Sequence, residues 1–179
     1  MFYISFTSMM IFITVIWILL RGYFALKNKN IDWKREIQLL LGYTCIVVIS
    51  RMVYFPMHLA DGHIQPMEFD ASRILPFKHN LRPFFFLQDI YNGWQINVIG
   101  NITMFIPVGI VWPICFKELN NIGKVTLAGF VYTLLIEISQ LPFYGRCSDV
   151  DDMILNTTGV FIGAVIYTIV KALIKRKKR

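Results

Sequence analysis

The chain has 179 residues, of which 56% are hydrophobic and only 16% are charged. A soluble domain of this size keeps most of its residues in contact with water, so this composition excludes an ordinary soluble globular protein. The formal net charge is +7. The three cysteines are too few and too scattered to form a disulfide framework.

The apolar residues form five runs, each about the length that a helix needs to cross the roughly 30 Å hydrocarbon core of a bilayer. In chain order the runs are Phe2–Leu26, Ile37–Phe55, Trp94–Phe116, Ile122–Leu141 and Met153–Ile174. The pattern predicts an all-α integral membrane protein, built as a bundle of about five transmembrane helices. The longest connection, residues 56–93, is rich in aromatic residues and prolines, and we expect it to lie along the membrane interface.

Lys and Arg residues set the expected orientation. Residues 21–36, 117–124 and 171–179 share one side of a five-span bundle, and they hold 13 of the 18 Lys and Arg residues but three of the 11 Asp and Glu residues. Because basic short loops stay in the cytoplasm, the N-terminus is expected outside and the C-terminus inside.

This topology divides the chain into three parts. Residues 1–36 contain the first helix and a basic cytoplasmic loop, residues 37–174 form the main transmembrane domain, and residues 175–179 form a basic cytoplasmic tail. The tail directly follows a span, so it is typical of contact with anionic lipid rather than with nucleic acid.

Polar side chains concentrate near the outer ends of four predicted spans. They are Arg51 in the second span, Asn97 and Asn101 in the third, Glu137 and Gln140 in the fourth, and Asp152 and Asn156 in the fifth. A charged side chain at mid-depth in a bilayer costs roughly 2.5–3.5 kcal/mol on insertion scales, and less near the ends. At about 1.5 Å per residue, all of these positions lie within roughly 10 Å of the outer boundary. We therefore expect them to form one polar site there.

The loop before the fifth span adds Arg146, Asp149 and Asp151 to this region, next to Asp152. Three carboxylates so close together repel one another unless a cation, an arginine or a helix end compensates their charge. Two interpretations stay open. Asp149 or Asp151 caps the fifth helix, or the three aspartates bind a divalent cation, which is the only cofactor that the sequence suggests.

The fifth span also carries a stripe of polar and small residues, which runs from Asp152 through Asn156 to Gly159 and Gly163. A Gly-x-x-x-Gly pair is typical of close helix packing in lipid, so this stripe is expected to face another helix.

Glu137 has two open interpretations: it forms a structural ion pair with Arg51, or both residues contact a ligand.

Three ordered motifs resemble the VanZ-like family. They are N-x-x-x-F-x-P-x-G at residues 101–109, E-x-x-Q at residues 137–140, and R-x-x-D-x-D-D-x-x-x-N-x-x-G at residues 146–159. Residues 74–77 are similar to a proline-phenylalanine segment of the family, and Arg51 to an arginine that precedes it. The resemblance covers roughly residues 40–174 and implies a multi-pass protein of the bacterial cell membrane. The family's namesake is associated with low-level resistance to teicoplanin, a lipid-anchored glycopeptide.

Three functions remain open. The first is binding of a membrane lipid, a lipoglycopeptide or a cell-wall precursor. The candidate binding residues are Arg51, Asn97, Asn101, Glu137, Gln140, Arg146, Asp149, Asp152 and Asn156. Nucleic acid is not expected as a partner. The second is a metal-assisted enzyme acting on a lipid-linked phosphate or sugar, with Glu137 as general base and Asp149, Asp151 and Asp152 as catalytic or metal-binding candidates. The third is a purely structural role, in which the polar residues hold the five helices together and the function lies in a partner protein. The oligomeric state is not predicted.

Overall fold

The computed structural model describes residues 2–28, 32–55, 62–75, 79–85 and 94–177. Within these residues, five helices are long and apolar enough to cross a membrane. Their bounds are α1 Phe6–Asn28, α2 Trp33–Tyr54, α3 Trp94–Cys115, α4 Ile122–Gln140 and α5 Val150–Lys177. The prediction of an all-α membrane protein with about five spans is therefore confirmed.

Capping side chains explain why three helices begin where they do. Ser5 Oγ accepts the N–H of Ser8 at 3.1 Å, so α1 begins at Phe6 rather than at the predicted Phe2. Asp32 accepts the N–H groups of Lys34 and Arg35, which starts α2 four residues before the predicted Ile37. Asn121 does the same for α4, which begins at Ile122 as expected.

The fifth helix is longer than the hydrophobic run that predicted it. It begins at Val150 and continues through Lys177, so the described part of the predicted tail is helical. Basic side chains at the C-terminal end of a helix face its negative dipole end, which favours this extension.

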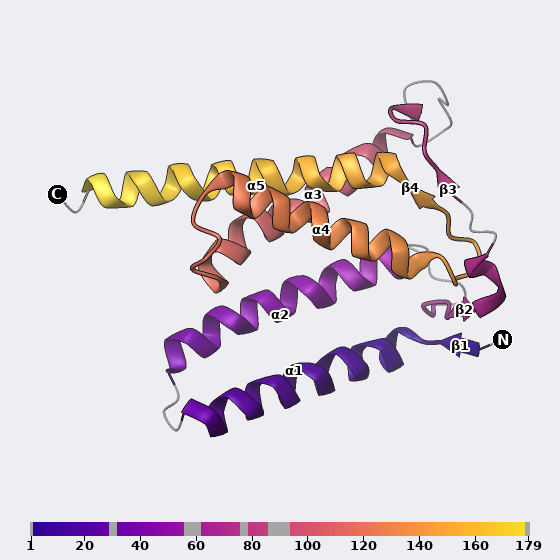
Figure 1. Cartoon of the computed structure of the whole chain (residues 1–179), viewed down its shortest axis with the longest axis horizontal. Helices are drawn as coiled ribbons and strands as arrows, with labels where there is room; N and C mark the ends of the chain where they lie inside the picture. Colours follow the sequence, from indigo (N-terminus) through magenta and orange to yellow (C-terminus); the bar gives the residue numbers. More distant parts are fainter. Residues whose placement is uncertain (1, 29–31, 56–61, 76–78, 86–93, 178–179) are drawn as a thin grey trace.

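Four short strands gather at one end of the bundle, where the N-terminus also lies, while the C-terminus lies at the opposite end (Figure 1). They are β1 Phe2–Ile4, β2 Met67–Phe69, β3 His79–Asn80 and β4 Ser148–Asp149, and a 3-10 turn, η1 Ala71–Ile74, follows β2. Strand β1 pairs antiparallel with β2, and β3 pairs parallel with β4. We call this the strand-bearing end.

Strand β1 corrects the sequence prediction for the first span. Residues 2–4 were expected to be the start of a transmembrane helix, but Ser5 caps the helix behind them and leaves their backbone available to pair with β2. The segment around β2 is held in turn by the connection between α4 and α5. Asp70 donates its N–H to Pro142 O at 2.9 Å, and Tyr144 donates to Glu68 O at 2.8 Å.

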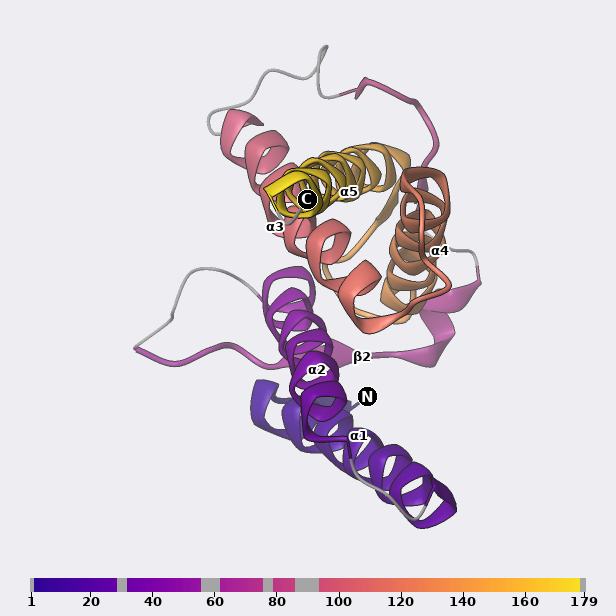
Figure 2. The same ribbon diagram turned by 90° about the vertical axis from the view of Figure 1, so that its left-hand side faces the viewer.

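Helix α5 lies against both α3 and α4, and α2 lies against α3 (Figure 2). Glycines allow the closest of these contacts. A Cβ added at Gly159 would collide with the carbonyl oxygen of Ile102, and one at Gly163 with that of Ile106. The predicted close-packing stripe of the fifth span is confirmed, and its partner is α3.

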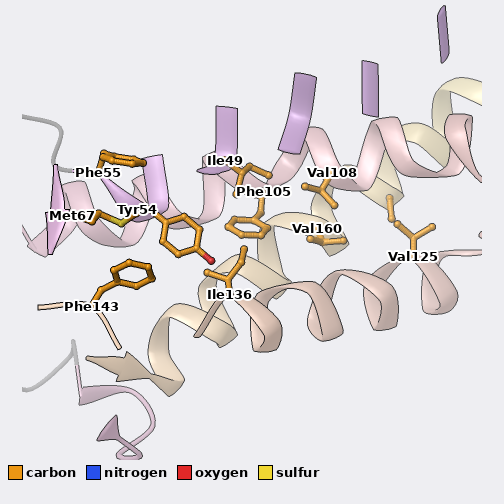
Figure 3. Close-up of a cluster of buried hydrophobic side chains, with 11 residues drawn as sticks. Ile49, Tyr54, Phe55, Met67, Phe105, Val108, Val125, Ile136, Phe143 and Val160 are labelled. Atoms are coloured by element: carbon orange, nitrogen blue, oxygen red, sulfur yellow. The ribbon is translucent and has the colours of Figure 1, made fainter. Parts of the chain in front are cut away.

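The apolar core runs along the bundle between α2, α3, α4 and α5 and ends beneath the strands (Figure 3). Phe105 and Val160 are fully buried at its centre. Tyr54 and Phe143 lie at the strand-bearing end, with ring centroids 6.0 Å apart in an edge-on arrangement.

Helix α1 lies at the periphery, beside α2 (Figure 2). Thr14 and Tyr43 share a hydrogen bond of 2.7 Å, and an ion pair joins Arg21 to Glu36. None of the described residues of α1 is buried, although Phe6 and Met9 at its N-terminal end pack against the edge of the core.

Candidate functional site

A polar pocket of about 280 Å³ opens at the strand-bearing end, where α2, α3, α4 and α5 meet. Seven of the nine residues predicted to bind a ligand line it: Asn97, Asn101, Glu137, Gln140, Arg146, Asp152 and Asn156. Helix ends from three spans and the loop between α4 and α5 supply these side chains. The structure therefore brings together most of the polar residues that the sequence placed at one depth.

The floor of the pocket is formed by buried side chains of α4 and α5. Glu137, Gln140 and Asn156 are exposed by only 2%, 6% and 3%. Gln140 donates to Val53 O at 3.2 Å, which connects α4 to the end of α2. Asn156 donates from Nδ2 to Thr133 Oγ1 at 2.9 Å, which connects α5 to α4. The floor thus joins three helices through hydrogen bonds between polar groups.

Asp152 lies one helical turn before Asn156 and accepts a hydrogen bond of 2.5 Å from Asn101 Nδ2. This bond connects the first turn of α5 to α3 and leaves the second carboxylate oxygen of Asp152 for the pocket. The stripe predicted along the fifth span is confirmed in this respect, since its polar end meets the pocket while its glycines meet α3.

Arg146 is the only cationic residue among the described residues that line the pocket. Burial lowers the pKa of its guanidinium, and the negative charges of Asp152 and Glu137 act in the opposite direction. None of the described carboxylates lies within ion-pair distance of this guanidinium. Arg146 therefore adds a positive charge to the lining of the pocket, near two acids with which it forms no ion pair.

Asp149 and Asp151 serve the local structure and are not among the described lining residues. Asp149 caps α5, because its Oδ1 accepts the N–H of Asp151 at 2.8 Å, which confirms the capping interpretation. Its carboxylate also accepts from Asn80 Nδ2 at 3.1 Å. The Asp151 carboxylate accepts the backbone N–H of Phe84 at 2.6 Å, at a position where Phe84 has a positive φ of 61°. Both aspartates hold the β3 segment in place.

These contacts bear on the predicted cation site. Asp149, Asp151 and Asp152 each bond a different part of the chain, and in the described ranges no three His, Cys, Asp or Glu residues are placed to hold a metal ion. The geometry gives no support to a shared cation, and metal binding by the three aspartates stays a prediction.

Arg51 is not brought into the pocket. Its guanidinium donates to Phe55 O at 3.2 Å and lies over the ring of Phe6, 5.8 Å from the centroid. No ion pair joins Arg51 to Glu137, because Arg51 contacts Phe55 O and Phe6 while Glu137 accepts the Asp149 N–H. The structural ion pair that the sequence left open is thus not formed. The similarity proposed for Pro76 and Phe77 falls outside the described residues.

Sequence reasoning missed several residues of the site. Met52, Val53, Met104, Gly145 and Cys147 complete the lining of the pocket. Thr133, which positions Asn156, is completely buried and lies one helical turn before Glu137, so the same-face spacing of these two residues was a usable signal. The contact of Asn80 with Asp149 had no such local signal.

A second groove of about 410 Å³ beside β2 has a mixed lining that includes Glu68 and Arg146, whereas grooves between the membrane spans are mainly apolar. One of about 590 Å³ lies between α1, α2 and the C-terminal end of α3, and includes Trp17, Tyr43 and Trp112 in its lining. In a bilayer such a surface faces acyl chains, so it does not by itself define a site.

The fold and the pocket define an integral membrane protein with a polar site at one end of its helical bundle. The chain belongs to the VanZ/LLP1 family, whose model matches residues 39–171. The match covers most of the four helices around the pocket and leaves out α1. Protein VanZ of Enterococcus faecium is 33% identical over 99 residues, which cover 55% of this chain and 58% of that protein. No solved structure matches this chain.

Proposed function

We propose that this chain is a multi-pass protein of the bacterial plasma membrane whose polar pocket binds the headgroup of an envelope lipid or a lipoglycopeptide, and that it lowers susceptibility to teicoplanin. One observation carries the proposal: seven polar residues, predicted from sequence and motif alone, line a single pocket of about 280 Å³. The teicoplanin part rests on the similarity to VanZ.

The pocket suits an amphiphilic ligand because of its place in the fold. Its residues lie at the ends of transmembrane helices, where a headgroup meets protein while its chains remain in the bilayer. Arg146 provides a guanidinium that is suited to a phosphate or carboxylate, because its planar fork matches two oxygens at once.

The expected orientation places this pocket on the outer face. Basic residues gather at the opposite end from the strands: on the facing ends of α1 and α2, in the loop between α3 and α4, and in the described part of the C-terminal tail (Figure 1). Basic loops remain in the cytoplasm, so the pocket would face the cell envelope, where a lipoglycopeptide acts.

A susceptibility assay tests the proposal. A Gram-positive host lacking a homologue would express the wild type, Arg146→Gln, Asp152→Asn or the control Arg82→Gln, whose exposed arginine lies in the β3 segment outside the described lining. Membrane abundance would be matched for all four. We expect wild type and the control to protect against teicoplanin and the two pocket variants to lose protection. Absence of protection by abundant wild type would refute the resistance part of the proposal. Pocket variants that protect as well as wild type once their abundance is matched would favour a purely structural polar set.

A further inference from the structure

We infer that the floor of the polar pocket receives a primary ammonium group of the amphiphilic ligand, through Asn156, Glu137 and Asp152. The inference rests on the proposed function, since it specifies which headgroup the pocket takes. It adds a requirement that the proposed function lacks: the ligand must carry N–H donors as well as an anionic group.

The first observation is an acceptor without a partner. Asn156 is exposed by only 3% and lines the pocket, and its Oδ1 has no hydrogen-bond partner among the described residues. Its Nδ2 is already used by Thr133. A buried amide oxygen without a donor costs about 1–3 kcal/mol, so a ligand that supplies a donor here regains that free energy on binding.

The second observation is that two carboxylates, Glu137 and Asp152, line the same pocket as Asn156. Glu137 accepts the Asp149 N–H with Oε2, and Asp152 accepts from Asn101 with Oδ1. Among the described residues, no group donates a hydrogen bond to the other oxygen of either carboxylate. Three acceptors from two helices therefore border the same small space, and a group with three N–H donors matches them in number.

Charge selects an ammonium over a neutral donor such as a hydroxyl. The described lining contains two carboxylates and one guanidinium, so an added cation would balance it. Buried charges are stable only when they are paired and hydrogen-bonded, and an ammonium provides both.

The position of Arg146 completes the ligand's description. Arg146 belongs to the loop between α4 and α5, and its side chain is partly exposed, unlike the buried side chains of the floor. An anion bound to Arg146 would therefore lie closer to the mouth of the pocket than the ammonium. A headgroup with an ammonium joined to a phosphate by a short linker fits this order of charges. Ethanolamine phosphate has that chemistry, and a lipoglycopeptide with free amines and a carboxylate shares it.

The test compares headgroups that differ in the methylation of their nitrogen, which replaces all three N–H donors. The purified full chain would be titrated calorimetrically with dihexanoyl phosphatidylethanolamine and dihexanoyl phosphatidylcholine, which have the same chains, phosphate and net charge. We expect at least about tenfold tighter binding of the ethanolamine lipid, because the trimethylated headgroup cannot donate to Asn156. Asn156→Leu should remove this preference. Asn156→Asp keeps an acceptor at the same place and should retain it, which separates loss of the acceptor from misfolding.

Two further arms identify the source of the ammonium. Free phosphoethanolamine tests whether lipid chains are needed, and teicoplanin before and after acetylation of its amines tests the glycopeptide. Equal binding of the ethanolamine and choline lipids, with both lost in Arg146→Gln, would overturn the ammonium inference and leave the proposed headgroup site standing. Absence of binding by every ligand would overturn both.

Discussion

The Glu137 carboxylate accepts a hydrogen bond of 3.0 Å from the backbone N–H of Asp149, and this bond joins the end of α4 to the residue that caps α5. Glu137 is therefore part of the structural connection between two helices and part of the pocket lining at the same time. The two roles use different properties of the side chain: the connection needs an acceptor oxygen, whereas a cationic ligand group needs the negative charge.

Substitutions of Glu137 should separate these roles. Glu137→Gln keeps an oxygen that can accept the Asp149 N–H, so its free energy of unfolding in detergent should stay within about 0.5 kcal/mol of wild type. Glu137→Ala leaves that N–H without its partner and should lower the free energy of unfolding by about 1–3 kcal/mol. Ligand binding and teicoplanin protection should be lost in both variants. Equal destabilisation by Gln and Ala would show that the charge itself is needed for folding.

Two arginines give a matched comparison for the site. Arg146 lines the pocket, whereas Arg51 contacts Phe55 O and Phe6 instead. Arg146→Gln should weaken binding of an anionic or zwitterionic lipid by about tenfold or more, since a buried charge-assisted hydrogen bond is worth roughly 1.5–3 kcal/mol. Arg51→Gln should leave the dissociation constant within about twofold, a change that lies within the usual range for surface substitutions. Equal losses in calorimetric titrations would place Arg51 at the ligand after all.

Glycine substitutions should reveal the close contact between α3 and α5. A Cβ at Gly159 would collide with Ile102 O, whereas one at Gly100 would meet no atom within 4 Å. Gly159→Ala should therefore lower the free energy of unfolding by about 1–3 kcal/mol, as overpacking does elsewhere. Gly100→Ala, in the same helix pair, should be neutral or slightly stabilising because alanine favours helix. Similar melting temperatures for the two variants would contradict this packing.

Cys147 allows the orientation to be measured. It is exposed at the strand-bearing end, while Cys45 and Cys115 lie within membrane spans. If this end faces outward, a membrane-impermeant maleimide should label intact cells that express the wild type but not cells that express Cys147→Ser. Labelling that appears only after the cells are opened would reverse the topology and place the pocket on the cytoplasmic side.

Local rules were sufficient for much of this protein. The five spans follow from runs of apolar residues, because a helix must satisfy its own backbone hydrogen bonds to cross lipid. Asp149 as the cap of α5 and the glycine face of the same helix follow from spacing alone. Most of the polar residues of the pocket could also be predicted, because counting residues along each span shows which polar groups lie at the same depth.

The tertiary structure decided what long-range contacts control. Strand β1 exists only because residues 67–69 return beside the N-terminus, and no local pattern predicts that pairing. Arg51 shares its depth with the pocket, yet depth does not specify the direction around a helix axis, and its neighbours turn it toward Phe6. Asp149, Asp151 and Asp152 are nearly adjacent in sequence but reach three different partners, because each successive helical residue turns by about 100°. Sequence determined which residues lie at the membrane surface, and packing determined which of them face one another.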